Sequence, residues 1–329
     1  MTVLVSGGAG YIGSHMVLEL LDRGESVVVL DNLSTGFWWA VPKEVPLVQG
    51  DVADQDLVAR LIAEHGITEI AHFAAKIVVP ESVADPLGYY LNNTVKTRAL
   101  LESAVRGGVR RVIFSSTAAV YGEPPVSPVP EEIELNPINP YGRSKLMSEW
   151  MLADAAKAHG LGYVVLRYFN VAGADPRGRS GQSSPNATHL IKVAGQAALG
   201  QRDGLEVFGT DYPTPDGTCV RDYIHVTDLA RAHLAALDHL RGGGASLTLN
   251  CGYGRGYSVK QVVEVVKKVS GVDFPVTFSG RRAGDPAALV AKADRIRNEL
   301  GWKPEHEDLE EIVRQALAWE DSLKTRNAV

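Results

Sequence analysis

Cysteine is scarce in this sequence: Cys219 and Cys251 are the only two among 329 residues. Neither lies in a CxxC pair or near a histidine at ligand spacing, so the sequence supports neither a disulfide framework nor a metal site. No run approaches the roughly 18 consecutive apolar residues that a membrane span requires. The first residues lack the basic segment of a signal peptide. We therefore expect a cytoplasmic protein with no bound metal and no membrane partner.

Clusters of basic residues are also missing, and the charge balance is mildly acidic. The chain has 33 Lys and Arg against 39 Asp and Glu, a formal net charge of −6. A protein that binds nucleic acid concentrates cations for the phosphates, so we expect no nucleic-acid partner. Hydrophobic residues make up 45% of the chain, which is ordinary for a globular protein. At about 150 residues per domain, the length predicts two domains.

Short apolar, β-branched runs alternate with helical patterns in the first half of the chain. This alternation predicts an α/β fold built on a doubly wound parallel sheet. We expect strands at 2–6, 26–30, 47–49, 69–72, 111–115 and 163–168, and helices at 11–23, 55–65, 87–106 and 141–159. Beyond residue 169 the pattern weakens. We expect 1–169 to form this sheet domain and 170–329 a smaller α/β domain, with a segment near 220–240 as the candidate for packing back on the first.

A glycine-rich loop lies between the first expected strand and the first expected helix. Gly7, Gly10 and Gly13 give it the spacing GxxGxxG. Such a loop can turn tightly and approach a pyrophosphate, and the helix that begins near Tyr11 directs free N–H groups at that anion. Asp31, at the end of the second strand, can accept hydrogen bonds from a ribose diol and would repel a 2′-phosphate. These features predict that the first domain is an NAD-binding Rossmann domain.

A tyrosine and a lysine follow Pro140 at the spacing YxxxK. Tyr141 and Lys145 share one face of the expected helix, where the ammonium stabilises a phenolate and lowers the tyrosine pKa toward neutrality. The segment 114–117 (Phe-Ser-Ser-Thr) ends the fifth strand at the same edge of the sheet. A hydroxyl group there can bridge a substrate and the tyrosine. Together with the glycine loop and Asp31, these residues indicate a catalytic site beside the nicotinamide.

The motifs resemble those of the extended short-chain dehydrogenase/reductase family, and in particular its UDP-glucose (UDP-galactose) 4-epimerases. The resemblance covers nearly the whole chain and includes two stretches specific to sugar-nucleotide epimerases, 207–217 and 220–226. The other matching segments are 5–15, 30–33, 72–75, 90–93, 114–122, 140–147 and 166–170. The resemblance implies an isomerase that interconverts UDP-glucose and UDP-galactose by inverting C4.

The resemblance also implies a mechanism, which passes through a 4-keto sugar and a transient hydride transfer to bound NAD. Tyr141 would remove the proton of the 4-hydroxyl group, and Thr117 would shorten the path of that proton. Lys145 would lower the pKa of Tyr141 and bind the nicotinamide ribose. The family usually forms homodimers through two helices of each subunit, which correspond here to 87–106 and 141–159.

The same resemblance assigns ligand-binding residues. For NAD it implies Gly7, Gly10, Tyr11, Ile12, Gly13, Asp31, Asn32, Asp51, Val52, Phe73, Ala74, Ala75, Asn92, Lys145 and Phe169. For the UDP-sugar it implies Thr117, Tyr141, Asn170, His189, Leu190, Phe208, Arg221, Arg282, Asp285 and Leu289. Arg221 and Arg282 are suited to a diphosphate, and Phe208 offers an apolar wall for uracil.

Three positions depart from the family pattern. His189 stands where Asn is common, and Ile77 replaces a Lys that often contacts the cofactor, although Lys76 precedes it. Leu289 lies where a Tyr in some members restricts the substrate to unacetylated sugars. Leucine is intermediate in size, so 4-epimerisation of UDP-N-acetylglucosamine or another UDP-sugar stays an alternative.

Other functions share parts of this pattern. A sugar-nucleotide dehydratase needs a further acid and base for elimination, usually Asp-Glu directly after the strand-end Thr. Here Thr117 is followed by Ala118 and Ala119, which cannot transfer a proton. A net dehydrogenase stays open, and it would release NADH in proportion to product. A non-catalytic NAD-sensing protein is the alternative from a different class.

Overall fold

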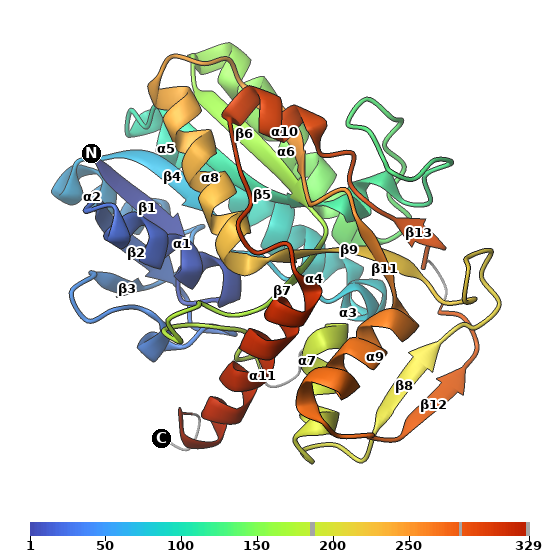
Figure 1. The fold of residues 1–329 in the computed structure, drawn as a ribbon. Coiled ribbons are helices and arrows are strands. Elements are labelled where there is room, and N and C mark those ends of the chain that lie inside the picture. The colour runs from blue at the N-terminus through green and yellow to red at the C-terminus, as the bar shows by residue number, and fades with distance from the viewer. Residues whose placement is uncertain (185–187, 283–284, 327–329) are drawn as a thin grey trace.

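A seven-stranded parallel sheet forms the centre of the structure, a computed structural model that describes residues 1–184, 188–282 and 285–326 (Figure 1). Its strand order is β10-β6-β5-β4-β1-β2-β3, so the order reverses between β1 and β4. The strands are β1 (Thr2–Ser6), β2 (Ser26–Asp31), β3 (Leu47–Gln49), β4 (Ile67–His72), β5 (Arg111–Thr117), β6 (Gly162–Tyr168) and β10 (Leu247–Cys251). The predicted doubly wound α/β fold is confirmed, and its ligand crevice lies beyond the carboxyl ends of these strands.

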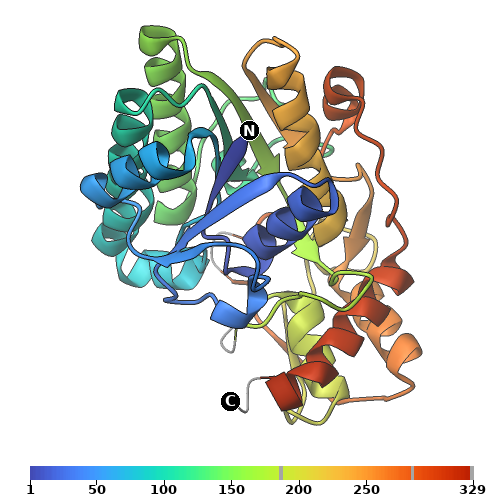
Figure 2. The ribbon, with the colours of Figure 1, turned by 90° about the vertical axis from the view of Figure 1, so that its left-hand side faces the viewer.

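Helices cover both faces of the sheet, and Figure 2 shows the two helix layers on either side of it. One face packs against α1 (Tyr11–Asp22) and α8 (Val226–Arg241), and the other against α2 (Gln55–His65), α5 (Lys96–Arg106) and α6 (Pro140–His159). Successive residues of β1 alternate between the two cores: Val3 and Val5 face α1, whereas Leu4 faces α2. Because both faces are buried, the strands are rich in apolar residues on both faces.

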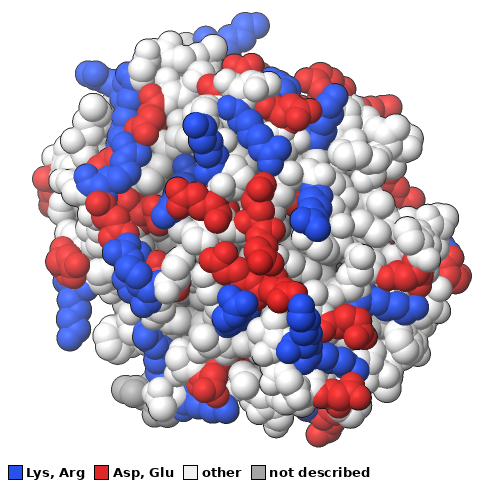
Figure 3. All heavy atoms as spheres, viewed as in Figure 1, with Lys and Arg blue, Asp and Glu red and all other residues white. Residues whose placement is uncertain are grey.

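Two elements from beyond residue 169 complete this layered unit. β10 pairs with β6 in parallel, with Leu247 opposite Val164, and α8 packs beside α1. Arg23 and Asp238 join α1 to α8 at 2.8 Å. Acidic and basic side chains are interleaved over the face of the molecule that Figure 3 shows. The sheet domain therefore takes a strand and a helix from the second part of the chain.

The rest of the second part forms two small sheets packed against helices. A four-stranded sheet contains β7 (Asn170–Ala172), β9 (Val220–His225), β11 (Gly256–Ser258) and β13 (Ala288–Leu289), and a two-stranded sheet contains β8 (Leu205–Phe208) and β12 (Val276–Ser279). The helices are α7 (Leu190–Ala198), α9 (Val259–Ser270), α10 (Asp294–Leu300) and α11 (Leu309–Arg326). Ser258 caps α9 through a capping box with Gln261, and Gly271 ends the helix in the left-handed conformation.

The prediction of one continuous helix at 87–106 is wrong for the middle of this segment. The segment contains α4 (Pro86–Tyr89), a π-helical turn η2 (Tyr90–Val95) and α5, and a further helix α3 (Val79–Ala84) precedes it. Asn93 gives the physical reason. Its buried side chain accepts from Lys76 N and donates to Lys76 O, both at 2.9 Å, and it also donates to Ser144 Oγ on α6. Bonds to groups outside the helix favour a widened turn at this point.

Two 3₁₀ helices lie next to the sheet edge that carries the candidate site. They are η1 (Trp38–Ala40), after β2, and η3 (Ala118–Tyr121), directly after β5. Cys219 and Cys251 are buried free thiols. Within the described ranges, no helix is both long and apolar enough to cross a bilayer. Across those same ranges, His, Cys, Asp and Glu side chains do not gather in threes as metal ligands would.

Candidate active site

The glycine loop between β1 and α1 fits a dinucleotide pyrophosphate. Gly7 has φ +75°, and a Cβ there would lie 2.6 Å from Ala74 N; a Cβ on Gly13 would lie 2.2 Å from Gly7 O. A Cβ on Gly10 would meet only Gly7 O, at 3.3 Å, so the space in front of Gly10 is open. Among the described residues, no side chain caps the N-terminus of α1 at Gly10. The first N–H groups of this helix are therefore available to an anion.

Asp31 ends β2 beside this loop. One carboxylate oxygen accepts a hydrogen bond from Ala9 N at 2.9 Å and the other from Leu33 N at 2.8 Å. These bonds hold the negative charge at the strand end and leave further lone pairs for a ribose diol. Such a site fits NAD and opposes a 2′-phosphate.

The other residues expected at the cofactor follow the strands at the same sheet edge. Tyr11 is in the first turn of α1, but its hydroxyl group donates to Gly173 O at 2.7 Å and so turns toward a neighbouring loop. Asp51 forms an ion pair with Lys96. The remaining expected residues lie at these places in the fold: Ile12 in α1, Asn32 after β2, Val52 after β3, Phe73, Ala74 and Ala75 after β4, Asn92 in η2, and Phe169 after β6.

Helix α6 brings Tyr141 to the end of β5. The helix begins at Pro140, and the preceding Asn139 accepts a hydrogen bond from Gly142 N at 2.8 Å. A Cβ on Gly142 would lie 2.5 Å from Ala119 O, so a glycine lets this helix approach η3 closely. Tyr141 is 7% exposed, so its side chain is almost completely shielded from water.

Thr117 and Lys145 complete the candidate catalytic group. Thr117 is the last residue of β5, and its side chain lies next to that of Tyr141, whose pKa it lowers. Lys145, one helical turn after Tyr141, donates to Ser115 O at 2.9 Å and lies 4.9 Å from the centre of the Phe114 ring. The structure thus brings together the tyrosine, the lysine and the strand-end hydroxyl.

The prediction that Lys145 lowers the pKa of Tyr141 does not agree with these contacts. Burial raises the pKa of Tyr141, and the hydrogen bond with Thr117 lowers it. Burial also lowers the pKa of Lys145 to about 7, while the nearby Glu149 carboxylate raises it. Because its pKa is about 7, the protonation of Lys145 near neutral pH depends on these neighbouring groups. The Lys145 ammonium donates its hydrogen bond to the backbone of β5 and not to the phenol.

Sequence reasoning missed the buried ion pair beside Lys145. Glu149 lies one turn further along α6, and its carboxylate accepts from Arg167 Nη2 at 2.6 Å; both side chains are 6% exposed. Ser116 also donates to this carboxylate. The signal was present in the sequence, because positions 141, 145 and 149 continue one series at a spacing of four.

The candidate substrate residues of the second part converge in two groups. In the first, Arg221 Nη2 lies 3.3 Å from Asp285 Oδ1, and Leu289 is paired in register with Arg221. The guanidinium of Arg282 lies 3.7 Å from the centre of the Phe208 ring. Asp285 N donates to Arg282 O at 3.4 Å, so the partner of Arg221 is joined to the cation that lies over Phe208. Two cations and an aromatic face are groups that a nucleoside diphosphate requires.

In the second group, Asn170, His189 and Leu190 line a small cavity. Gln182 Nε2 lies 2.7 Å from Nδ1 of His189. Burial, and then the Lys192 ammonium, lower the pKa of His189, so its imidazole is neutral at pH 7. With the amide donating to Nδ1, the imidazole carries its proton on Nε2 and remains a donor, as an asparagine at this position would be.

Comparisons with known proteins agree with this arrangement. Residues 3–252 match the model of the "NAD dependent epimerase/dehydratase family". The UDP-glucose 4-epimerase of Azospirillum brasilense is 59% identical over 98% of this chain and 92% of its own length. The crystal structure of UDP-glucose 4-epimerase from Brucella ovis in complex with NAD has a TM-score of 0.94 and 48% identity, with 96% of this chain and 97% of that chain covered.

A third relative is named for two sugars. The UDP-Glc/GlcNAc 4-epimerase from Campylobacter jejuni has a TM-score of 0.86 and 50% identity, with 98% of this chain and 99% of that chain covered. Identity at this level over whole chains extends far beyond a shared fold. The chain therefore belongs to the NAD dependent epimerase/dehydratase family, and its resemblance to the UDP-glucose 4-epimerases is confirmed.

Proposed function

We propose that this protein interconverts UDP-glucose and UDP-galactose by inverting C4 of the sugar, with NAD as its bound cofactor. The observation that carries the proposal is the meeting of Tyr141, Thr117 and Lys145 at the end of β5, beside a glycine loop that fits a pyrophosphate. The confirmed family membership supports the same reaction.

Tyr141 moves the proton in this mechanism. NAD, when bound, supplies a reversible acceptor for the hydrogen on C4. Tyr141 takes the proton from the 4-hydroxyl group and later returns it, and the Thr117 hydroxyl group carries it over the gap between sugar and phenol. Burial of the site excludes water, which protects the 4-keto sugar from side reactions.

The second part of the chain would hold the nucleotide while the sugar turns. Inversion requires the 4-keto sugar to present both faces to the same group, so the sugar must rotate while its diphosphate stays fixed. Arg221 and Arg282 would supply the cations for that diphosphate, and Phe208 would offer an apolar face to the uracil. Asn170 and His189, which line one small cavity, would donate to the sugar or phosphate oxygens.

The proposal is tested by incubating the purified protein with UDP-galactose and no added NAD. We expect UDP-glucose to appear by chromatography, with no growth of NADH absorbance. A rise of NADH in proportion to product would identify a dehydrogenase instead. Absence of any product from a protein that contains bound NAD would refute the proposal and favour a non-catalytic NAD sensor.

A broader substrate range is favoured by one observation. Leu289, paired beside Arg221, is half-buried and smaller than the tyrosine that restricts some members of the family. The Campylobacter jejuni relative, at 50% identity, is named for both UDP-Glc and UDP-GlcNAc. We therefore propose UDP-N-acetylglucosamine as a second substrate, to be measured in the same assay.

We also propose that the protein is a homodimer in the cytoplasm. Leu87, Leu91 and Val95 follow one another at a spacing of four and are 78%, 56% and 52% exposed. On the adjacent helix α6, Met147 and Trp150 are exposed as well. An apolar stripe over two packed helices is typical of an interface between subunits, and the buried free thiols fit a reducing compartment.

A further inference from the structure

The loop that follows β2, residues 32–41, lies directly on the glycine loop. Phe37 N donates to Ala9 O at 3.0 Å. A Cβ on Gly36 would lie 2.8 Å from the backbone of Ala9, so the two loops touch without an intervening side chain. Because Asp31 starts this loop and the pyrophosphate-binding glycines lie beneath it, residues 32–41 border the adenosine half of the candidate cofactor site.

Two neighbouring tryptophans in this loop have different environments. Trp38 is 60% exposed. Trp39 is half-buried and lies near two aromatic rings. Its ring centre is 5.0 Å from that of Phe37 and 6.2 Å from that of Trp319. Trp319 belongs to α11, the last helix of the chain, so this contact joins the two ends of the sequence.

Trp319 is held firmly on its own side. Its indole N–H donates to Ser183 Oγ at 3.2 Å, and a Cβ on Gly181 would lie 2.4 Å from the indole ring. The next residue, Glu320, forms a buried ion pair with Lys192 of α7. Trp319 is 4% exposed. It is therefore a fixed surface on which Trp39 rests.

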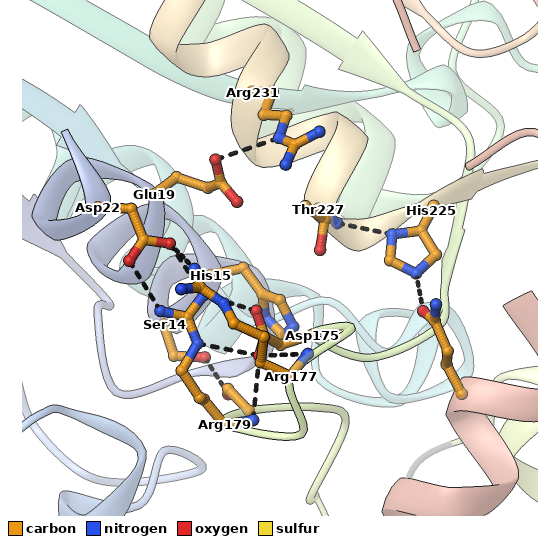
Figure 4. Close-up of polar contacts among 12 residues, drawn as sticks. Ser14, His15, Glu19, Asp22, Asp175, Arg177, Arg179, His225, Thr227 and Arg231 are labelled. Carbon is orange, nitrogen blue, oxygen red and sulfur yellow. Dashed lines mark hydrogen bonds and ion pairs between the residues drawn. The ribbon is translucent and has the colours of Figure 1, made fainter. Parts of the chain in front are cut away.

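Residues 175–183, which end at the Ser183 partner of Trp319, are themselves fastened to α1, and Figure 4 shows the contacts of Asp175 and Arg179 with this helix region. Ser180 Oγ lies 2.7 Å from Ser14 Oγ, and Arg179 pairs with Asp22 at 3.0 Å and with Asp175 at 2.7 Å. The helix whose N-terminus faces the cofactor is thus joined through residues 173–183 to Trp319. None of these bonds involves residues 32–41, so they do not oppose an opening movement of that loop.

We propose that Trp39 and Trp319 form a clasp that keeps residues 32–41 closed over the adenosine half of the NAD site. Trp39 is then a positioning residue for the cofactor: it acts through the loop that begins at Asp31. Release of NAD requires the Trp39–Trp319 contact to separate. This inference rests on the NAD-binding part of the proposed function and is independent of which sugar is the substrate.

The experiment compares Trp39→Ala with Trp38→Ala, two identical side chains next to one another of which only the first contacts Trp319. Each holoprotein is mixed with excess thionicotinamide adenine dinucleotide, and NAD that leaves the protein is measured by chromatography over time. Loss of an aromatic pair is expected to increase the equilibrium constant for opening of the loop roughly 2- to 12-fold. We expect about fivefold faster release from Trp39→Ala or more, and a rate within about twofold of the parent from Trp38→Ala.

Two further variants keep the result interpretable. Trp39→Phe retains a ring against Trp319, so we expect it to release NAD slowly. Where Trp39→Ala does not yield folded protein by circular dichroism, Trp39→Leu removes the ring and retains most of the apolar volume. Equal release rates from Trp39→Ala (or Trp39→Leu) and Trp38→Ala would overturn the clasp. Failure of the sugar assay alone, with release rates as expected, would overturn the proposed function and leave the clasp intact.

Discussion

Lys145 on α6 donates a hydrogen bond to the backbone oxygen of Ser115, 2.9 Å away in β5. The next strand residue, Ser116, donates to Glu149, one turn further along the helix. Two successive residues of the strand thus hold two successive turns of the helix. This register fixes the rotation of α6 and therefore the position of its catalytic face.

Tyr141→Phe removes the hydroxyl group that we assign to proton transfer at O4. We expect kcat for UDP-galactose to fall by roughly 10²- to 10⁴-fold, the range for loss of a general acid–base group. NAD content should remain that of the parent, because the ring and its packing are retained. Turnover is measured by chromatography. Wild-type-like turnover in Tyr141→Phe would remove the basis of the mechanism.

Glu149→Gln tests how the charge of Lys145 is maintained. The Glu149 carboxylate raises the Lys145 pKa, which burial lowers to about 7, so its removal makes the lysine lose its proton at lower pH. We expect the alkaline decline of kcat to begin roughly one pH unit lower. Ser116→Ala is the matched control, because it removes a hydrogen bond to the same carboxylate and keeps the charge. An identical shift in both variants would show that packing, and not charge, is responsible.

Leu289→Tyr tests the size of the sugar pocket. A bulkier side chain beside Arg221 should exclude an N-acetyl group, so we expect the UDP-GlcNAc/UDP-glucose rate ratio to fall at least about tenfold, a range that shape rejection commonly gives. Leu289→Met, of similar volume, is the control and should leave the ratio unchanged. An unchanged ratio in Leu289→Tyr would show that this position does not set specificity.

Buried histidines make stability depend on pH. Burial lowers the pKa of His15, His225 and His233 to about 4 and that of His72 to about 3. In the unfolded chain these groups bind protons near pH 6.5, so between about pH 6.5 and 4 the unfolded state binds more protons and the free energy of unfolding falls as pH falls. Each contributes up to about 1.4 kcal/mol per pH unit.

Burial raises the pKa of Asp222 to about 6 and also raises that of Glu131, which opposes this trend, but these are two carboxyl groups against five histidines, because the pKa of His189 is lowered as well. We therefore expect urea unfolding at pH 5 to have a lower midpoint than at pH 7. His72→Asn removes one titrating group and should reduce the slope of stability with pH, whatever its effect at pH 7. A midpoint that does not change between pH 7 and 5 would contradict this account.

The proposed homodimer is tested at its apolar stripe. Leu91→Glu places a charge in the middle of the exposed row, where burial without a partner is costly. We expect this variant to elute as a monomer, measured by light scattering after gel filtration, while the parent elutes as a dimer. Val272→Glu, an exposed apolar position elsewhere on the chain, should remain dimeric. A monomeric parent would refute the proposal.

The sequence predicted the parts of the site that depend on local spacing. Strand, glycine loop and helix occur in order at Gly7–Gly13, and the i, i+4 relation of Tyr141 to Lys145 requires no tertiary information. Each is placed as expected, because short-range geometry determines it.

Features that depend on distant segments could not be predicted. The π-helical turn at η2 follows from bonds between Asn93, Lys76 and Ser144, residues far apart in the sequence. The partner of Glu149 on α6 is Arg167, which lies on strand β6. The contact of Trp39 with Trp319 joins opposite ends of the chain, so no local pattern in the sequence indicates it.

The position of β10 has a consequence for how the protein is made. The strand that borders β6 ends at Cys251, long after the catalytic helix has left the ribosome. Until then β6 is a bare sheet edge of apolar residues, which readily pairs with other chains. We expect a fragment ending at Phe169 to aggregate, and a nascent chain to depend on rapid synthesis or chaperone protection until its last sheet strand emerges.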